Sequence, residues 1–85
     1  MSRGNGQRLA ELIEIVARAL VDKPDEVSVR KGRGDRNPRI ELTVAPDDIG
    51  KVIGKDGRTA QSMRILLNAA ASKLGGGRAY LDILD

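Results

Sequence analysis

The residues best placed to do chemistry in this chain form a short turn, Gly54-Lys55-Asp56-Gly57, which is followed at once by Arg58. Glycine adopts positive φ angles and lets a ligand approach the backbone without meeting a Cβ atom. The helical pattern after the turn offers unpaired N–H groups and the positive end of a helix dipole. Lys55 and Arg58 add positive charge, so the turn suits a phosphate group.

Two other phosphate-binding motifs do not fit these residues. A P-loop needs G-x-x-x-x-G-K followed by Ser or Thr, but the spacing from Gly50 to Gly54 is one residue too short and Asp56 follows Lys55. The dinucleotide fingerprint G-x-G-x-x-G is absent, and there is no second βα unit to complete that fold. A plain helix–helix turn is the alternative that needs no ligand, because glycine and aspartate are common turn residues.

Composition narrows the class of protein. At 85 residues the chain predicts one domain, residues 1–85, of which residues 1–6 are expected to be flexible. The net charge of +3 weakly favours a polyanionic partner. The sequence has no Cys and no His, which excludes thiolate nucleophiles and the commonest metal ligands. We therefore expect a non-catalytic protein with no metal site and no cofactor.

The sequence also argues against a membrane protein. The first six residues lack the apolar stretch of a signal peptide. The most apolar segment, residues 9–21, contains three charged side chains and cannot span a bilayer. We expect a soluble cytoplasmic protein that does not associate with a membrane.

Hydrophobic periodicity predicts the elements that hold the turn in place. Helical spacing appears in two apolar sets, Leu9, Leu12, Ile13, Val16 and Leu20 in the first helix and Met63, Leu66, Leu67, Ala70, Ala71 and Leu74 in the last. Asn5 is a candidate N-cap for the first helix. Alternation predicts strands over residues 27–30, 40–44 and 78–84. The basic loop at residues 31–39 is either a solvated tip or one edge of a nucleic-acid site.

A short helix should lead directly into the turn. Pro46-Asp47-Asp48 opens it, since proline is tolerated early in a helix and acids favour its first turn. The alternative role for these two adjacent acids is an acid/base pair, which the lack of any His, Cys or metal cluster makes the weaker interpretation. The predicted order is α-β-β-α-α-β.

This element order resembles that of the KH domain, whose GXXG loop clamps about four nucleotides. The segment that resembles the GXXG loop is Val52-Ile53-Gly54-Lys55-Asp56-Gly57. The order matches the type II arrangement, an α+β fold in which three helices pack on one face of a three-stranded sheet. The length and layout are similar to the KhpA family of small bacterial stand-alone KH proteins. The resemblance covers nearly the whole chain.

The resemblance implies a site for single-stranded RNA. Gly54, Lys55, Asp56 and Gly57 would hold the phosphodiester backbone, with Asp56 turned away or capping the next helix. Lys51 and Arg58 would add attraction that does not depend on sequence. The bases would lie in a groove beside three apolar residues that face the second strand, unless these residues simply pack in the core: Ile49, Val52 and Ile53.

The resemblance also implies a function and partners. We expect low sequence specificity and a role in post-transcriptional regulation or as an RNA chaperone. Family members form homodimers and pair with a larger KH-containing protein, and a contact near Met63, Ile65 and Leu66 is our hypothesis for this chain. The alternative function is a protein–protein adaptor whose fold serves dimerisation and partner binding.

Overall fold

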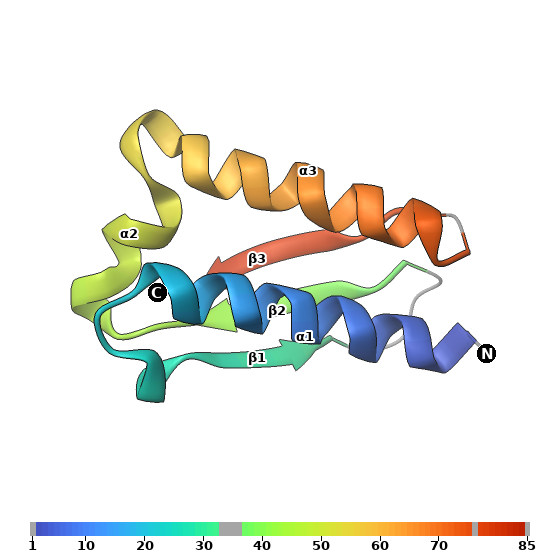
Figure 1. The fold of residues 1–85 in the computed structure, drawn as a ribbon, viewed down its shortest axis with the longest axis horizontal. Helices are drawn as coiled ribbons and strands as arrows, with labels where there is room; N and C mark the ends of the chain where they lie inside the picture. The colour runs from blue at the N-terminus through green and yellow to red at the C-terminus, as the bar shows by residue number, and fades with distance from the viewer. Residues whose placement is uncertain (1, 33–36, 76, 85) are drawn as a thin grey trace.

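The structure, a computed structural model, describes residues 2–32, 37–75 and 77–84, and its elements follow the predicted order (Figure 1). The helices are α1 (Ser2–Leu20), α2 (Ile49–Ile53) and α3 (Arg58–Lys73). The strands are β1 (Ser28–Lys31), β2 (Arg39–Thr43) and β3 (Tyr80–Leu84). Short 3₁₀ turns occupy Pro24–Glu26, Pro46–Asp48 and Lys55–Gly57.

The three strands form one mixed sheet in the order β1-β2-β3. β1 pairs with β2 in antiparallel fashion, with Val29 opposite Leu42, and β2 pairs with β3 in parallel, with Leu42 opposite Ile83. A parallel pair needs a long crossover connection, and here α2 and α3 supply it. Because β2 and β3 point the same way, their carboxyl ends meet at one end of the sheet, where α2 lies (Figure 1).

A single aliphatic core lies between the helices and one face of the sheet. The predicted alternation is confirmed in β2, where Ile40 and Leu42 are buried and the residues between them face outward. α2 joins the same core through Val52, which is fully buried. Helix and sheet therefore enclose one cluster: Leu9, Ala10, Ile13, Ala17, Ile40, Leu42, Val44, Val52, Met63, Leu67, Ala71, Ala79 and Leu81.

The N-terminal helix differs from the prediction at both ends. Asn5 lies within the helix and not at its N-cap position, because α1 begins at Ser2. The buried Gly6 lies against the Lys31 side chain, so contact with the end of β1 supports this part of the helix. At the other end Leu20 is exposed and Ala17 is buried instead, because α1 ends at Leu20 beyond the edge of the core.

The last helix has the predicted bounds, with one change to its buried face. Met63, Leu67 and Ala71 are buried as predicted, whereas Leu66 is 50% exposed. The buried stripe is narrower than the apolar stripe in the sequence because the sheet and α1 cover only part of the helix. None of the helices in the described part of the chain is long and apolar enough to cross a membrane.

Candidate nucleic-acid interface

The turn between α2 and α3, which we call the clamp loop (Gly54–Gly57), has a backbone that glycine makes possible. Gly54 has φ 78° and Gly57 has φ 74°, and Asp56 between them is also left-handed at φ 56°. The N–H of Gly54 donates to the carbonyl of Gly50 at 2.8 Å, and the N–H of Gly57 donates to the carbonyl of Gly54 at 3.1 Å. The loop is thus a hydrogen-bonded turn with a defined shape.

The two glycines serve this shape in different ways. A Cβ atom added at Gly54 would overlap the Thr59 hydroxyl and come within 2.9 Å of the Thr59 backbone nitrogen. A Cβ atom added at Gly57 would meet nothing within 4 Å. Gly54 is therefore required by packing as well as by its φ angle, whereas Gly57 is required by its φ angle alone. Thr59, which the sequence did not single out, forms one wall of the loop.

The cations of the clamp loop are available to a ligand. Lys55 and Arg58 are exposed, and neither forms an ion pair with any residue that the structure describes. α3 begins at Arg58 after Gly57, with no side-chain cap on its first turn. Positive charge and open helix N–H groups therefore lie together, which is the arrangement that favours an anion.

Asp56 is exposed and makes no side-chain hydrogen bond within the described residues. Its predicted capping role is wrong, because Gly57 occupies the N-cap position of α3. The left-handed backbone at Asp56 is a conformation that aspartate tolerates better than most residues. A role in shaping the turn therefore explains this residue without a contact to a phosphate.

The apolar residues of α2 divide between two roles. Val52 has no exposed surface and packs in the core, so it cannot contact a base, and the core-packing alternative holds for it. Ile49 and Ile53 are half-buried and keep some exposed surface. Figure 1 shows α2 beyond the carboxyl end of β2, and a groove for the bases beside Ile49 and Ile53 stays a prediction.

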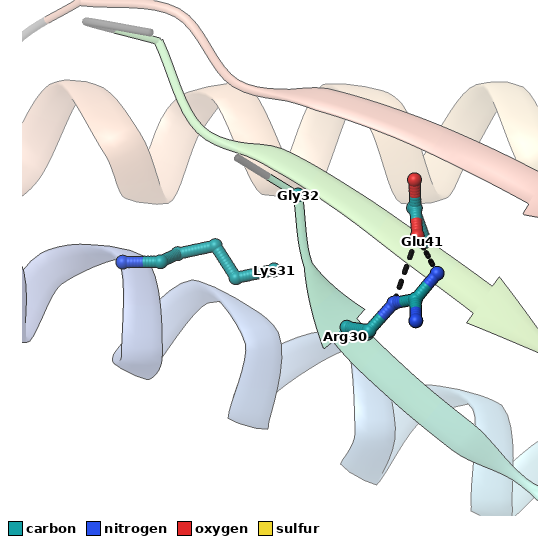
Figure 2. A pocket seen from close by; sticks show the side chains of 4 residues that line it. All are labelled: Arg30, Lys31, Gly32 and Glu41. Carbon is teal, nitrogen blue, oxygen red and sulfur yellow. Dashed lines mark hydrogen bonds and ion pairs between the residues drawn. The ribbon is translucent and has the colours of Figure 1, made fainter. Parts of the chain in front are cut away.

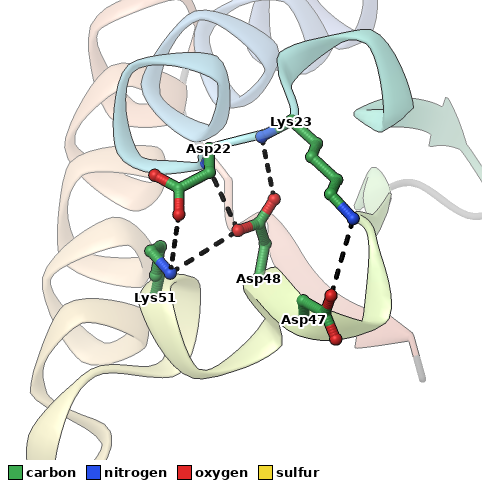
Figure 3. Close-up of polar contacts among 5 residues, drawn as sticks. All are labelled: Asp22, Lys23, Asp47, Asp48 and Lys51. Carbon is green, nitrogen blue, oxygen red and sulfur yellow. Dashed lines mark hydrogen bonds and ion pairs between the residues drawn. The ribbon is translucent and has the colours of Figure 1, made fainter.

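Lys51 does not belong with the cations of the clamp loop. Its Nζ lies 3.2 Å from Asp22 Oδ2 and 3.7 Å from Asp48 Oδ1 (Figure 3). Its charge is therefore already balanced by two carboxylates of the chain, the exposed Asp22 and the buried Asp48. The expectation that Lys51 faces a ligand rested on its distance in sequence from Gly54, and the partner 29 residues away could not be read from that spacing.

Asp48 is the centre of this second cluster, which we call the Asp48 junction (Asp22, Lys23, Asp48 and Lys51). Its side chain is 1% exposed. Oδ1 accepts the backbone N–H of Asp22 at 3.2 Å, and Oδ2 accepts the backbone N–H of Lys23 at 3.0 Å (Figure 3). Asp48 lies at the start of the helix as predicted, but its carboxylate accepts hydrogen bonds from the segment after α1 and does not cap α2.

The junction shifts two pKa values in directions that preserve charge. Burial alone raises the pKa of Asp48, but the N–H donors of Asp22 and Lys23 and the charge of Lys51 outweigh it, so the pKa lies below 3.8. The hydrogen bond and charge of Asp22 raise the pKa of Lys51 above 10.5. Both groups are ionised at neutral pH.

The neighbouring Asp47 is exposed, and its carboxylate lies 3.5 Å from Lys23 Nζ. It forms a surface ion pair and is not half of an acid/base pair with Asp48.

A pocket at the other end of the sheet is separate from the clamp loop. It is lined by Arg30, Lys31, Gly32 and Glu41, and the Arg30 guanidinium there is paired with Glu41 at 2.9 Å (Figure 2). Lys31 lies opposite Ile40, and the N–H of Gly32 donates to the carbonyl of Arg39, so both lie at the amino-terminal end of β2, whereas α2 follows its carboxyl end (Figure 1). The flanks of the predicted basic loop are therefore not beside the clamp loop; residues 33–36 themselves lie outside the described part.

The outer surface of α3 carries two exposed apolar side chains. Ile65 is 64% exposed and Leu66 is 50% exposed, whereas Met63 is 2% exposed and belongs to the core. Met63 is therefore excluded from the hypothetical dimer contact, and the other two residues remain candidates. On the opposite side of the molecule Tyr80, the chain's one aromatic residue, lies 5.4 Å from the Arg39 guanidinium.

The mixed sheet, the element order and the GXXG turn between α2 and α3 define the class: a KH domain of type II, as the sequence predicts. The chain belongs to the KhpA/KhpB family, whose KH-domain model matches residues 10–83. This family is not an enzyme family, and the prediction of a non-catalytic protein is confirmed.

Several relatives agree with this assignment. RNA-binding protein KhpA of Caldanaerobacter subterraneus is 54% identical over 65 residues, which cover 76% of this chain and 87% of that protein. RNA-binding protein KhpA of Halalkalibacterium halodurans is 51% identical, with 87% of this chain and 96% of that protein covered. A crystal structure of Aquifex aeolicus Era bound to GDP and AlF4⁻ shares the fold, with a TM-score of 0.65 and 21% identity over 88% of this chain and 29% of Era.

Proposed function

We propose that this chain is an RNA-binding protein that holds single-stranded RNA at the clamp loop. The observation that carries the proposal is a glycine turn at the start of α3 beside two exposed cations, Lys55 and Arg58, which form no ion pair with any described residue. Backbone N–H groups and cations at one point suit a phosphodiester. Membership of a family whose relatives are named RNA-binding protein KhpA supports RNA as the polyanion.

The proposed interface is smaller than the sequence suggests. It consists of Gly54, Lys55, Gly57 and Arg58 for the backbone, with the exposed parts of Ile49 and Ile53 beside the bases. Lys51 and Val52 are left out because one is ion-paired and the other is buried. Asp56 belongs to the loop as a shape-giving residue.

Low sequence specificity follows from the kind of contact proposed. Contacts to phosphates position a strand without reporting its bases. Base stacking on aromatic rings would strengthen binding, but Tyr80 lies at the first position of β3, at the end of the strand away from the clamp loop, and stacks on Arg39. We place the KH domain of residues 1–85 in the cytoplasm, as an RNA chaperone or a post-transcriptional regulator.

A charge reversal at the clamp loop tests the proposal. Fluorescence anisotropy with a labelled single-stranded RNA compares wild type with Lys55→Asp, which places a second carboxylate in the loop. We expect affinity to fall at least about tenfold, since a phosphate contact is lost and a repulsion is added. Lys73→Asp is the matched control, because this exposed lysine at the end of α3 has the same charge and is remote from the loop.

The outcomes separate a specific clamp from general charge. An effect confined to folded Lys55→Asp supports the clamp loop. Equal losses in both variants would mean that net charge alone attracts RNA. Unaltered binding by both variants would move the RNA site elsewhere, and no binding by wild type would favour the adaptor function.

A protein–protein role is the second candidate, and the exposed Ile65 and Leu66 of α3 favour it. Two apolar side chains in adjacent positions would become buried if two copies met through this helix, or if a larger KH-containing protein bound there. Sedimentation of Ile65→Lys tests the homodimer, with Gln61→Lys as a control that adds the same charge to an exposed polar position of the helix. A mass unchanged from wild type in Ile65→Lys removes this surface from the proposal.

A further inference from the structure

The Asp48 junction joins two parts of the chain that are far apart in sequence. Asp48 is the one charged residue that is buried in the described part of the chain. It precedes α2, and the N–H groups that it accepts belong to Asp22 and Lys23, just after α1. A buried carboxylate is costly unless it is fully hydrogen-bonded, and here each of its oxygens has a backbone donor. The arrangement is a specific connection between these two segments.

The helix that follows Asp48 depends on such connections. α2 has five residues, far fewer than the 12–15 or so that an isolated helix needs to be even marginally stable in water. Val52, the fourth of its five residues, packs in the core. Its amino-terminal end is held by Asp48, whose own helix receives no side-chain cap.

The clamp loop begins where this short helix ends. Gly54 is the residue directly after α2, and its N–H is bonded to the carbonyl of Gly50 inside the helix. A tilt of α2 would therefore move the Gly54–Gly57 turn with it. The far wall of the loop is Thr59 of α3, so the loop keeps its shape only if α2 and α3 keep their relative position.

We propose that Asp48 is a positioning residue for the clamp loop: it fixes the start of α2 to the segment after α1 and so sets where the Gly54–Gly57 turn lies. Lys51 contacts the same carboxylate and also pairs with Asp22. The effect on RNA rests on the proposed function, whereas the effect on the loop itself can be measured without RNA.

Asp48→Asn is the test variant, because it keeps the size of the side chain but replaces one acceptor oxygen with an NH₂ group. That group would face a backbone N–H donor and break one of the two bonds. Asp47→Asn is the matched control, since this neighbouring side chain is exposed and makes a single surface pair. Ile13→Val is a second control. Ile13 lies on the buried face of α1, so the variant loses stability at a place remote from the junction.

Two readouts are expected to move together in Asp48→Asn. The backbone amide resonances of Gly54 and Gly57 should shift in the RNA-free protein, and affinity for a labelled single-stranded RNA should fall about threefold to tenfold. Asp47→Asn should change neither readout. Ile13→Val should lower the melting temperature without shifting the glycine resonances or weakening RNA binding.

Each outcome decides the proposal. Unshifted glycine resonances in folded Asp48→Asn overturn it, as does an equal loss of RNA affinity in an equally destabilised Ile13→Val. If wild type binds no RNA, the proposed function fails, but the glycine resonances still decide whether Asp48 positions the loop.

If Asp48→Asn does not fold, hydrogen exchange in the wild type takes its place. The amide hydrogens of Asp22, Lys23 and Gly54 should then open as one unit with the same free energy, because the junction couples them. Exchange at Gly54 that is far faster than at Asp22 and Lys23 would mean that the loop moves independently, and would overturn the proposal.

Discussion

The two ends of α2 differ in whether their charged side chains are paired. At its start the Asp48 junction buries a carboxylate, gives both of its oxygens N–H donors and balances the nearby Lys51 with two acids. At its end the clamp loop leaves Lys55 exposed and without an ion pair among the described residues. Two lysines four positions apart therefore have different surroundings. Lys51 is paired with the acids of the junction, whereas Lys55 is the cation that we propose binds RNA.

The largest effect is expected from the glycine that shapes the clamp loop. Gly54→Ala should lower the free energy of unfolding by about 2–4 kcal/mol, because the residue there has a positive φ angle and its added Cβ would overlap Thr59. Gly57→Ala should cost about 1 kcal/mol, since its Cβ meets open space. Urea denaturation measures both. Equal losses would show that the φ angle alone matters and that Thr59 gives way.

The next effect separates the residue that supports α2 from one that can touch a ligand. Val52→Ala should lower the free energy of unfolding by about 1–3 kcal/mol, because it opens a cavity in the core. Because Val52 is buried, any loss of RNA affinity in the folded variant would come from a shift of α2 and not from a lost contact with a ligand.

The half-buried Ile53 provides the comparison for Val52. Ile53→Ala should destabilise the protein less and weaken RNA binding more than Val52→Ala. The reverse ranking in anisotropy measurements would place the bases elsewhere on the surface.

A direct comparison of the two lysines follows. Lys55→Gln should weaken RNA binding by about threefold to tenfold and make the slope of log K against log salt shallower by about 0.7, the value of one phosphate contact to a single strand. Lys51→Gln should leave that slope unchanged, since its charge is already paired with Asp22 and Asp48. Equal changes in slope would show that Lys51 leaves its partners to bind RNA.

The smallest effect is a dependence of stability on pH that belongs to the junction alone. The pKa of Asp48 is lower in the folded protein than its ordinary 3.8, so its contribution is present above that value and is lost as the pH falls through the folded pKa. The pKa of Lys51 is raised above 10.5, so its contribution is lost only as the pH rises beyond that.

The difference in stability between wild type and Asp48→Asn should therefore be constant from about pH 5 to pH 9 and shrink below pH 4. Asp47→Asn provides the control curve. Thermal melts across this range measure the difference, and a change centred near pH 6 or 7 would contradict the lowered pKa of Asp48.

Much of the fold could be predicted because its signals are local. The alternation in β2 and β3 and the bounds of α3 follow from the spacing of apolar residues and from the glycines after Leu74. The errors occur where an apolar stripe is wider than the surface that covers it. Leu20 and Leu66 have the correct spacing but lie beyond their neighbours, while Ala17 is buried despite its small contribution to the pattern.

The shape of the clamp loop was predictable to a similar degree. Its glycines and cations stand out in the sequence because backbone freedom and charge follow from residue types at neighbouring positions. Lys51 and Asp48 are three residues apart, so their contact with each other is local, but their other partners come from the segment after α1, 25 to 29 residues away, and were not predictable. A helix of five residues is also too short for periodicity to reveal that Val52 is the buried member of its apolar set.

The sequence by itself determined the order of the elements, the GXXG turn and the positive charge beside it, since these depend on residue types and on spacing along a few turns of chain. The tertiary structure alone decided which charges are paired within the chain and which form no ion pair with a described residue. That choice depends on which groups approach within a few ångströms after folding, and the packing of α1 against α2 brings Asp22 and Lys23 to Asp48 while leaving Lys55 without a described partner.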